Sequence, residues 1–134
     1  MLTYTLTINE AQLKVMTVAL EEFFRLRLGQ CWDLVDDLAF SGFDYKNHTA
    51  KEFDERIRRR DDARSIIQTG MNVAFGQSVC RDIGDIGRIC EDMWSVARHQ
   101  LWKDNPNHSE WTVDSYEPRP VSNEPLMTIQ RIEH

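Results

Sequence analysis

The apolar positions at the start of the chain follow two different periods. Residues 2–8 alternate apolar side chains with threonine, the period of two that is typical of a half-buried strand. From Asn9 to Phe40 the apolar residues recur at helical spacing without a proline, and Asn9 and Gln12 are placed as a capping box. We predict a strand over 2–8 and a continuous or slightly kinked helix over about 9–40. The alternative is that Gly29 ends this helix and that a second one begins at Gln30.

Two further helices are predicted downstream. Thr49 and Glu52 form a second capping-box signature, and Gly76 stands where a helix often ends. The apolar residues between them predict a helix over about 50–75. A third stripe predicts a helix over about 82–102.

The C-terminal region changes character after a turn at 103–107. Alternating residues predict strands over about 110–116 and 126–132, joined by a proline-rich connection. Together with the N-terminal strand they can form one antiparallel sheet. We therefore predict a single α+β domain over residues 1–134, with three helices packed against a small antiparallel sheet.

Composition and charge exclude several classes of protein. A chain of 134 residues suits one domain, and its net charge of −6 disfavours general nucleic-acid binding. No apolar run is long enough to cross a membrane, and the first residues do not resemble a signal peptide. Cys31, Cys80 and Cys90 have no CxxC spacing, which favours reduced thiols in a cytoplasm. The pattern indicates no cofactor.

Paired carboxylates offer one candidate chemistry. Acidic residues stand three apart on two predicted helices, as Glu52 with Glu55 and Asp82 with Asp85. Two such pairs on facing helices could hold Mg²⁺ against a nucleotide, as in all-helical pyrophosphohydrolases. Ion pairing with nearby arginines and favourable placement at a helix N-terminus explain the same residues without a metal.

Arginines beside aromatic residues offer a second chemistry. A guanidinium group can bind phosphate while an aromatic ring stacks on a base, which suits a phosphorylated heterocycle. Such a tryptophan can also belong to the core, with its arginine paired to a carboxylate. The candidate ligand-binding residues are Arg25, Arg27, Arg98, His99, Trp102 and Trp111.

Short segments at both ends of the chain carry a family resemblance: the opening strand, residues 19–21 with Arg25 and 29–30, residues 97–99 with 101–102, and residues 105–106, 113–114, 117–118 and 122–126 (SNEPL). These segments resemble a family of small proteins encoded by tailed phages and prophages. The resemblance covers both ends of the chain and little of the middle helix. A glycine pair expected after Asn105-Pro106 is replaced by Asn107, His108 and Ser109.

The pattern is similar to the first type of Thoeris anti-defence proteins, which are phage sponges. The resemblance implies a homo-oligomer in the cytoplasm of an infected bacterial host. It implies a recessed pocket that sequesters a cyclic ADP-ribose signal or a cyclic oligonucleotide without cleaving it. No ligand motif of the sponges can be matched residue by residue.

The tryptophans supply an independent reason to expect an oligomer. Four are present, which is a large number for one small core, so some should lie in a subunit interface: Trp32, Trp94, Trp102 and Trp111. Two functional classes remain in play, a signal-binding sponge and a metal-dependent nucleotide hydrolase. A plain interaction protein acting on a host enzyme is a third, which no sequence feature favours or disfavours.

Overall fold

The computed structural model describes residues 1–76 and 82–133, which separate into two compact units. Unit 1 combines Met1–Phe24 with Ile83–His134, and unit 2 is the intervening Arg25–Asp82. The prediction of one domain over residues 1–134 stays a prediction.

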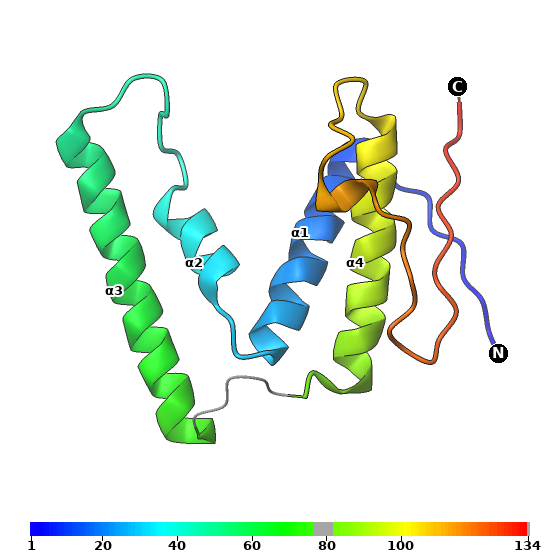
Figure 1. Cartoon of the computed structure of the whole chain (residues 1–134), viewed down its shortest axis with the longest axis horizontal. Helices are drawn as coiled ribbons and strands as arrows, with labels where there is room; N and C mark the ends of the chain where they lie inside the picture. Colours follow the sequence, from blue (N-terminus) through cyan, green and yellow to red (C-terminus); the bar gives the residue numbers. More distant parts are fainter. Residues whose placement is uncertain (77–81, 134) are drawn as a thin grey trace. The chain divides into compact units, whose positions relative to one another are not determined.

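The described residues form helices and no strands, so the predicted α+β fold with an antiparallel sheet is wrong. In chain order they are α1 (Glu10–Arg27), α2 (Trp32–Ala39), α3 (Ala50–Phe75) and α4 (Gly84–Asp104), followed by a short 3-10 helix, η1 (Val113–Ser115). Figure 1 labels the four α-helices.

The predicted N-terminal strand over 2–8 is an extended segment without strand pairing. Its first three alternating apolar side chains are exposed rather than half-buried, at 83% for Leu2, 85% for Tyr4 and 71% for Leu6. The alternation of apolar and polar residues indicates which face of a strand would be buried. A stable strand also needs a neighbouring strand with which to form hydrogen bonds. The described residues provide none for this segment.

The two predicted C-terminal strands are also absent. Residues 110–116 fold into turns and η1, and residues 126–132 have no regular structure. Two side chains of α4 hold the backbone at η1. Arg98 donates a hydrogen bond to the carbonyl oxygen of Val113 (2.7 Å), and a ring nitrogen of His99 forms a hydrogen bond with the carbonyl oxygen of Asp114 (2.8 Å). These long-range contacts replace strand pairing.

The predicted helix over 9–40 is interrupted at Gly29, so the favoured continuous helix is wrong and the two-helix alternative is confirmed. Gly29 has a φ of 84°, a conformation that glycine adopts without steric cost. The backbone N–H of Gln30 then donates to the carbonyl of Arg25 (2.8 Å), as at many glycine-terminated helix ends. The helical spacing of the apolar residues therefore continues across Gly29, although the helix itself ends there.

Both predicted capping boxes are confirmed. Asn9 and Gln12 exchange backbone-to-side-chain hydrogen bonds of 2.9 Å in each direction at the start of α1. Thr49 and Glu52 exchange the same kinds of bond (2.8 and 3.2 Å) at the start of α3, which ends at Phe75, directly before Gly76, as predicted. These caps satisfy backbone N–H groups that a helix leaves without partners in its first turn.

Unit 2 is held together by arginines of α3 that bind the end of α2. Arg56 donates to the carbonyl oxygens of Ala39 (3.0 Å) and Ser41 (3.1 Å), and Arg64 forms an ion pair with Asp36. Beside them, Phe53 contacts an aromatic group in the connecting loop. These contacts with α2 and the loop after it involve α3 residues from Phe53 to Arg64.

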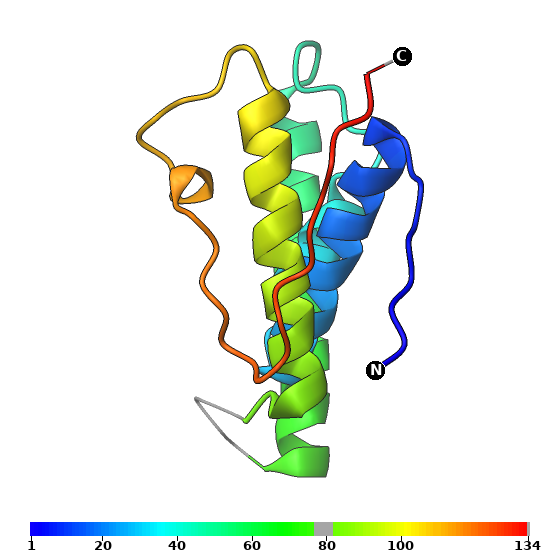
Figure 2. The same ribbon diagram turned by 90° about the vertical axis from the view of Figure 1, so that its right-hand side faces the viewer.

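Unit 1 is built on the packing of α1 against α4, which lie side by side in both views (Figure 1 and Figure 2). Phe24 of α1 is 5% exposed, and its ring centre lies 5.2 Å from that of Trp94. The Cys90 thiol donates to the carbonyl of Leu20 (3.1 Å), and burial raises the pKa of this thiol. Ala97 of α4 is fully buried.

The cysteines were predicted to be reduced. Cys31 and Cys90 are free and buried, while Cys80 lies outside the described residues.

No helix in the described part of the chain combines the length and the apolar character that a membrane crossing requires.

The Glu52 capping contact is expected to make stability depend on acidic pH. The backbone N–H of Thr49 donates to the Glu52 carboxylate (2.8 Å), and this bond lowers the pKa of Glu52 below its ordinary 4.5. Its stabilising contribution is therefore present above pH 4.5 and is lost as pH falls through the lower folded pKa. Urea unfolding between about pH 6 and pH 3 measures this loss. Glu52→Gln should flatten part of the decline, and parallel curves would contradict the assignment.

Candidate functional site

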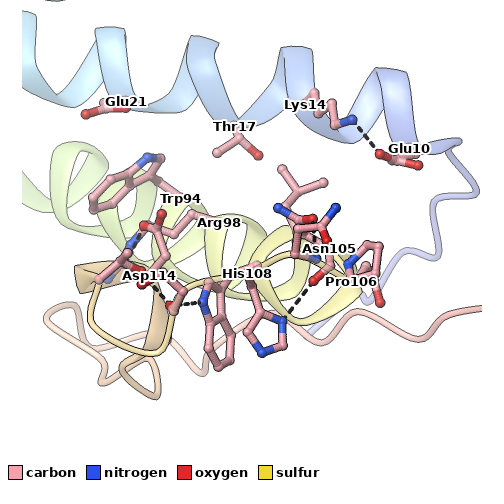
Figure 3. Close-up of a pocket in the computed structure, with 16 residues that line it drawn as sticks. Glu10, Lys14, Thr17, Glu21, Trp94, Arg98, Asn105, Pro106, His108 and Asp114 are labelled. Atoms are coloured by element: carbon pink, nitrogen blue, oxygen red, sulfur yellow. Dashed lines mark hydrogen bonds and ion pairs between the residues drawn. The ribbon is translucent and has the colours of Figure 1, made fainter.

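A pocket of about 710 Å³ lies within unit 1. It is lined by polar residues of α1, by the last three turns of α4 and by the segment that follows α4 up to Asp114. Figure 3 shows Lys14 and Thr17 from α1 on one side, with Arg98 and Trp94 of α4 opposite them. The volume falls in the range of small-molecule sites, and many of the lining side chains can form hydrogen bonds.

Arg98 has a structural role in the wall of this pocket. Its Nη1 atom donates to the Val113 carbonyl and forms an ion pair with Asp114 (3.0 Å), while its guanidinium carbon lies 4.6 Å from the ring centre of Trp94. The side chain is 13% exposed. Its Nε atom is buried without a hydrogen-bond partner among the described residues. Arg98 thus fixes η1 and retains a donor that lacks an acceptor.

Trp102 lies beside two imidazole rings. It stacks on His99 with ring centres 5.4 Å apart and contacts His108 at 4.3 Å, while its indole N–H donates to the carbonyl of Ser109 (2.8 Å). His108 is itself held by the carbonyl of Asn105 (2.9 Å). These bonds shape the loop that forms one side of the pocket.

Carboxylates outnumber cations along the pocket wall. The two cations each have an acidic partner, because Lys14 forms an ion pair with Glu10 and Arg98 with Asp114. The lining carboxylates are those of Glu10, Glu21, Asp104 and Asp114. Hydroxyl groups of a ligand could therefore find many acceptors here, whereas a phosphate would have to compete for the cations.

The structure brings two of the six predicted ligand-binding residues, Arg98 and Trp102, to this pocket. His99 is 5% exposed and bonds Asp114, and Trp111 is 95% exposed without lining the pocket. Arg25 bonds Asp33 (2.8 Å) in unit 2, and Arg27 is the last residue of α1. The ligand-binding role of all six residues stays a prediction.

The alternative metal set is placed in pairs on different segments. Glu52 belongs to the capping box and Glu55 bonds Arg59 (2.7 Å), while Asp85 lies 3.4 Å from Arg88. Asp82 precedes α4. Within residues 1–76 and 82–133, no group of three or more His, Cys, Asp or Glu side chains is arranged to hold a metal ion.

The sequence interpretation missed Asp92, which is 4% exposed. Its carboxylate accepts the backbone N–H groups of Val121 (2.8 Å) and Ser122 (3.1 Å), and also the Ser122 hydroxyl. Asp92 therefore anchors the C-terminal segment to α4. Asp92 follows Ile89 by three residues and precedes Val96 by four, so it lies on the same side of the helix as these apolar residues. This spacing is the sequence signal that could have predicted its burial.

Lys14 and His108 were also missed as pocket residues. Lys14 stands on the polar side of α1, and His108 lies in a loop whose course depends on the Trp102–Ser109 bond. Neither position carries a local pattern that marks a site.

Comparisons with protein-family models, with curated proteins and with solved structures found no match for this chain.

Proposed function

We propose that this chain binds a cyclic nucleotide signal in the unit 1 pocket and sequesters it without cleaving it. By the resemblance of its segments to phage sponges, it would act as a counter-defence protein in the cytoplasm of an infected bacterium. The observation that carries the proposal is the pair of cations that line this pocket, Arg98 of α4 and Lys14 of α1. A phosphate oxygen is a strong acceptor for a guanidinium or ammonium N–H.

The remaining lining groups suit the other parts of such a ligand. The ring of Trp94 or His108 can contact a base, and the carboxylate and amide oxygens of Asp104 and Asn105 can accept from ribose hydroxyls. Lys14 can add a second phosphate contact. Its exposed pair with Glu10, four residues apart on α1, is of a kind worth about 0.3–0.5 kcal/mol and is easily exchanged.

The competing function is a Mg²⁺-dependent nucleotide hydrolase. Incubation with Mg²⁺ and a panel of linear and cyclic nucleotides, followed by chromatography, separates the two functions. A sponge returns the ligand unchanged after denaturation, whereas a hydrolase releases product. Product formation that Glu52→Gln and Asp85→Asn both abolish would overturn the proposal.

Arg98→Lys is expected to weaken binding about tenfold or more, because an ammonium group cannot reproduce the planar guanidinium contact. It retains a charge for Asp114 and should disturb the fold less than alanine does. Calorimetric titration with cyclic ADP-ribose isomers and cyclic dinucleotides measures the change. Asp114→Asn is the matched control, since it breaks the same ion pair but keeps the guanidinium. Equal affinity of wild type and Arg98→Lys would contradict the phosphate role of Arg98.

A further inference from the structure

His99 of α4 is a buried side chain whose two ring nitrogens differ in their surroundings. The residue is 5% exposed. Its Nδ1 atom lies 2.8 Å from the backbone carbonyl oxygen of Asp114, whereas its buried Nε2 atom has no hydrogen-bond partner among the described residues. A carbonyl oxygen can only accept a hydrogen bond, so Nδ1 carries the proton of the neutral ring. Nε2 is then left as a buried acceptor without a donor.

The charged group that faces Nε2 is a carboxylate. The Oε1 atom of Glu117 lies 3.7 Å from Nε2. With a neutral ring, two acceptors face each other across this distance and neither can donate. A proton on Nε2 would turn the contact into a charge-assisted hydrogen bond, whose usual length of about 2.7–2.9 Å the Glu117 side chain can reach by a small rotation. His99 and Glu117 belong to the same compact unit, unit 1.

Two other charged groups near His99 are paired with each other. Arg98 precedes it on α4 and forms an ion pair with Asp114 (3.0 Å), so these two charges largely cancel at the imidazole ring. Within the described residues, the ring forms no ion pair with a charged group of α1 or of the C-terminal segment. Glu117 is therefore the group whose charge can stabilise a proton on Nε2.

An aromatic ring beside His99 also favours its charged form. The indole of Trp102 stacks on the imidazole, with ring centres 5.4 Å apart and planes 16° from parallel. An imidazolium in this position gains a cation–π interaction that a neutral ring lacks. Burial opposes the charge, so the carboxylate of Glu117 is needed to offset the lost hydration.

These contacts join α4 to the wall of the unit 1 pocket. Trp102 and Asp114 both line the pocket, and Glu117 follows Asp114 by three residues along the same segment. The neutral His99 ring is attached to this segment by one hydrogen bond, through Nδ1. A second bond, from Nε2 to Glu117, would attach the ring at both ends and restrain the chain just after η1.

We propose that His99 and Glu117 form a proton-operated latch, in which one proton taken up by Nε2 of His99 bonds the Glu117 carboxylate and fastens the segment after η1 to α4. The latch is open while the ring is neutral. It closes as the ring becomes charged, in the range around pH 6.5 in which imidazoles ordinarily titrate. No ligand takes part, so the latch and the sponge function can fail independently of each other.

Ring nitrogen chemical shifts of His99 in the full chain, followed by NMR from about pH 8 to pH 5, test the proton site. At the higher pH we expect a proton on Nδ1 alone, and at the lower pH a proton on each nitrogen. Glu117→Gln should lower the ratio of charged to neutral His99 at about pH 6 by about threefold or more, the scale of an ion pair at a protein surface. Glu110→Gln is the matched control, because it removes the same charge before η1 from a residue that has no ion pair with His99, and it should titrate like wild type.

Exchange of the Tyr116 backbone amide proton, divided by its intrinsic rate at each pH, shows whether the segment is fastened. This N–H donates to the carbonyl of Val113 (3.3 Å), within the segment that the latch restrains. Wild type and Glu117→Gln should exchange equally at about pH 8, and the variant should exchange about threefold faster at about pH 6. A neutral ring at pH 5, a proton on Nε2 alone at pH 8, equal titration of wild type and Glu117→Gln, or an effect of Glu117→Gln on exchange that is the same at both pH values would each overturn the proposal.

Discussion

Asp92→Ala is expected to lower the free energy of unfolding by about 3 kcal/mol, because it removes a buried carboxylate that accepts three hydrogen bonds. The lost acceptor serves the backbone N–H groups of Val121 and Ser122 and the Ser122 hydroxyl. Hydrogen bonds to a charged group are stronger than neutral ones, and this carboxylate is 4% exposed. Urea unfolding monitored by circular dichroism measures the change.

The control is Ser122→Ala, which removes only the hydroxyl donor and keeps both backbone bonds. We expect it to cost about 1 kcal/mol. Limited proteolysis gives a second readout, since Asp92→Ala should expose the segment after Val121 to cleavage while α4 stays protected. An Asp92→Ala variant as stable as Ser122→Ala would refute the anchoring role.

Phe24→Ala is expected to lower the free energy of unfolding by about 3–5 kcal/mol, because it leaves a cavity between α1 and α4. Phe24 is 5% exposed and packs against Trp94. Thermal unfolding followed by tryptophan fluorescence measures the loss and reports on the surroundings of Trp94. A large destabilisation here would establish the α1–α4 contact as the centre of unit 1.

The adjacent phenylalanine supplies a matched control. Phe23 is 44% exposed, so Phe23→Ala removes the same number of atoms from a less buried position. It should cost about 1 kcal/mol. Equal effects of the two substitutions would mean that Phe24 does not occupy the core position assigned to it.

Local signals at helix ends predicted the helices well. The Thr49–Glu52 capping box and Gly76 located α3 within a residue at each end, because these groups satisfy the backbone of the helix they bound. Gly29 separates α1 from α2, although the apolar spacing predicted a continuous helix. Periodicity continued through it, and periodicity does not report whether the residue between two helical segments has a positive φ.

The sheet was wrongly predicted because strand pairing depends on a partner that alternation cannot supply. Residues 2–8 have the alternation of a strand, yet Leu2 and Tyr4 are exposed. Around Val113 the decisive contacts come from Arg98 and His99, fifteen residues earlier. Such long-range bonds override a local preference for extended backbone.

The candidate site was predicted only in part, for a related reason. Arg98 and Trp102 were selected as an arginine beside aromatic residues, and both line the pocket. The partners that limit their chemistry, Asp114 and Ser109, lie on the following segment and could not be assigned from spacing. The residue types suggested a ligand, whereas the tertiary contacts determine how much of each side chain such a ligand can reach.

The division of the chain into units has a consequence for the order of events during synthesis on the ribosome. Unit 2 is one continuous stretch, so its contacts can form soon after Asp82 has emerged. Unit 1 joins residues from both ends of the chain, and Asp92 meets Val121 and Ser122 only after about thirty more residues have been translated. Until then its carboxylate stays hydrated and α4 lacks its anchor. Unit 1 is therefore the part of the nascent chain that is exposed longest to chaperones and proteases.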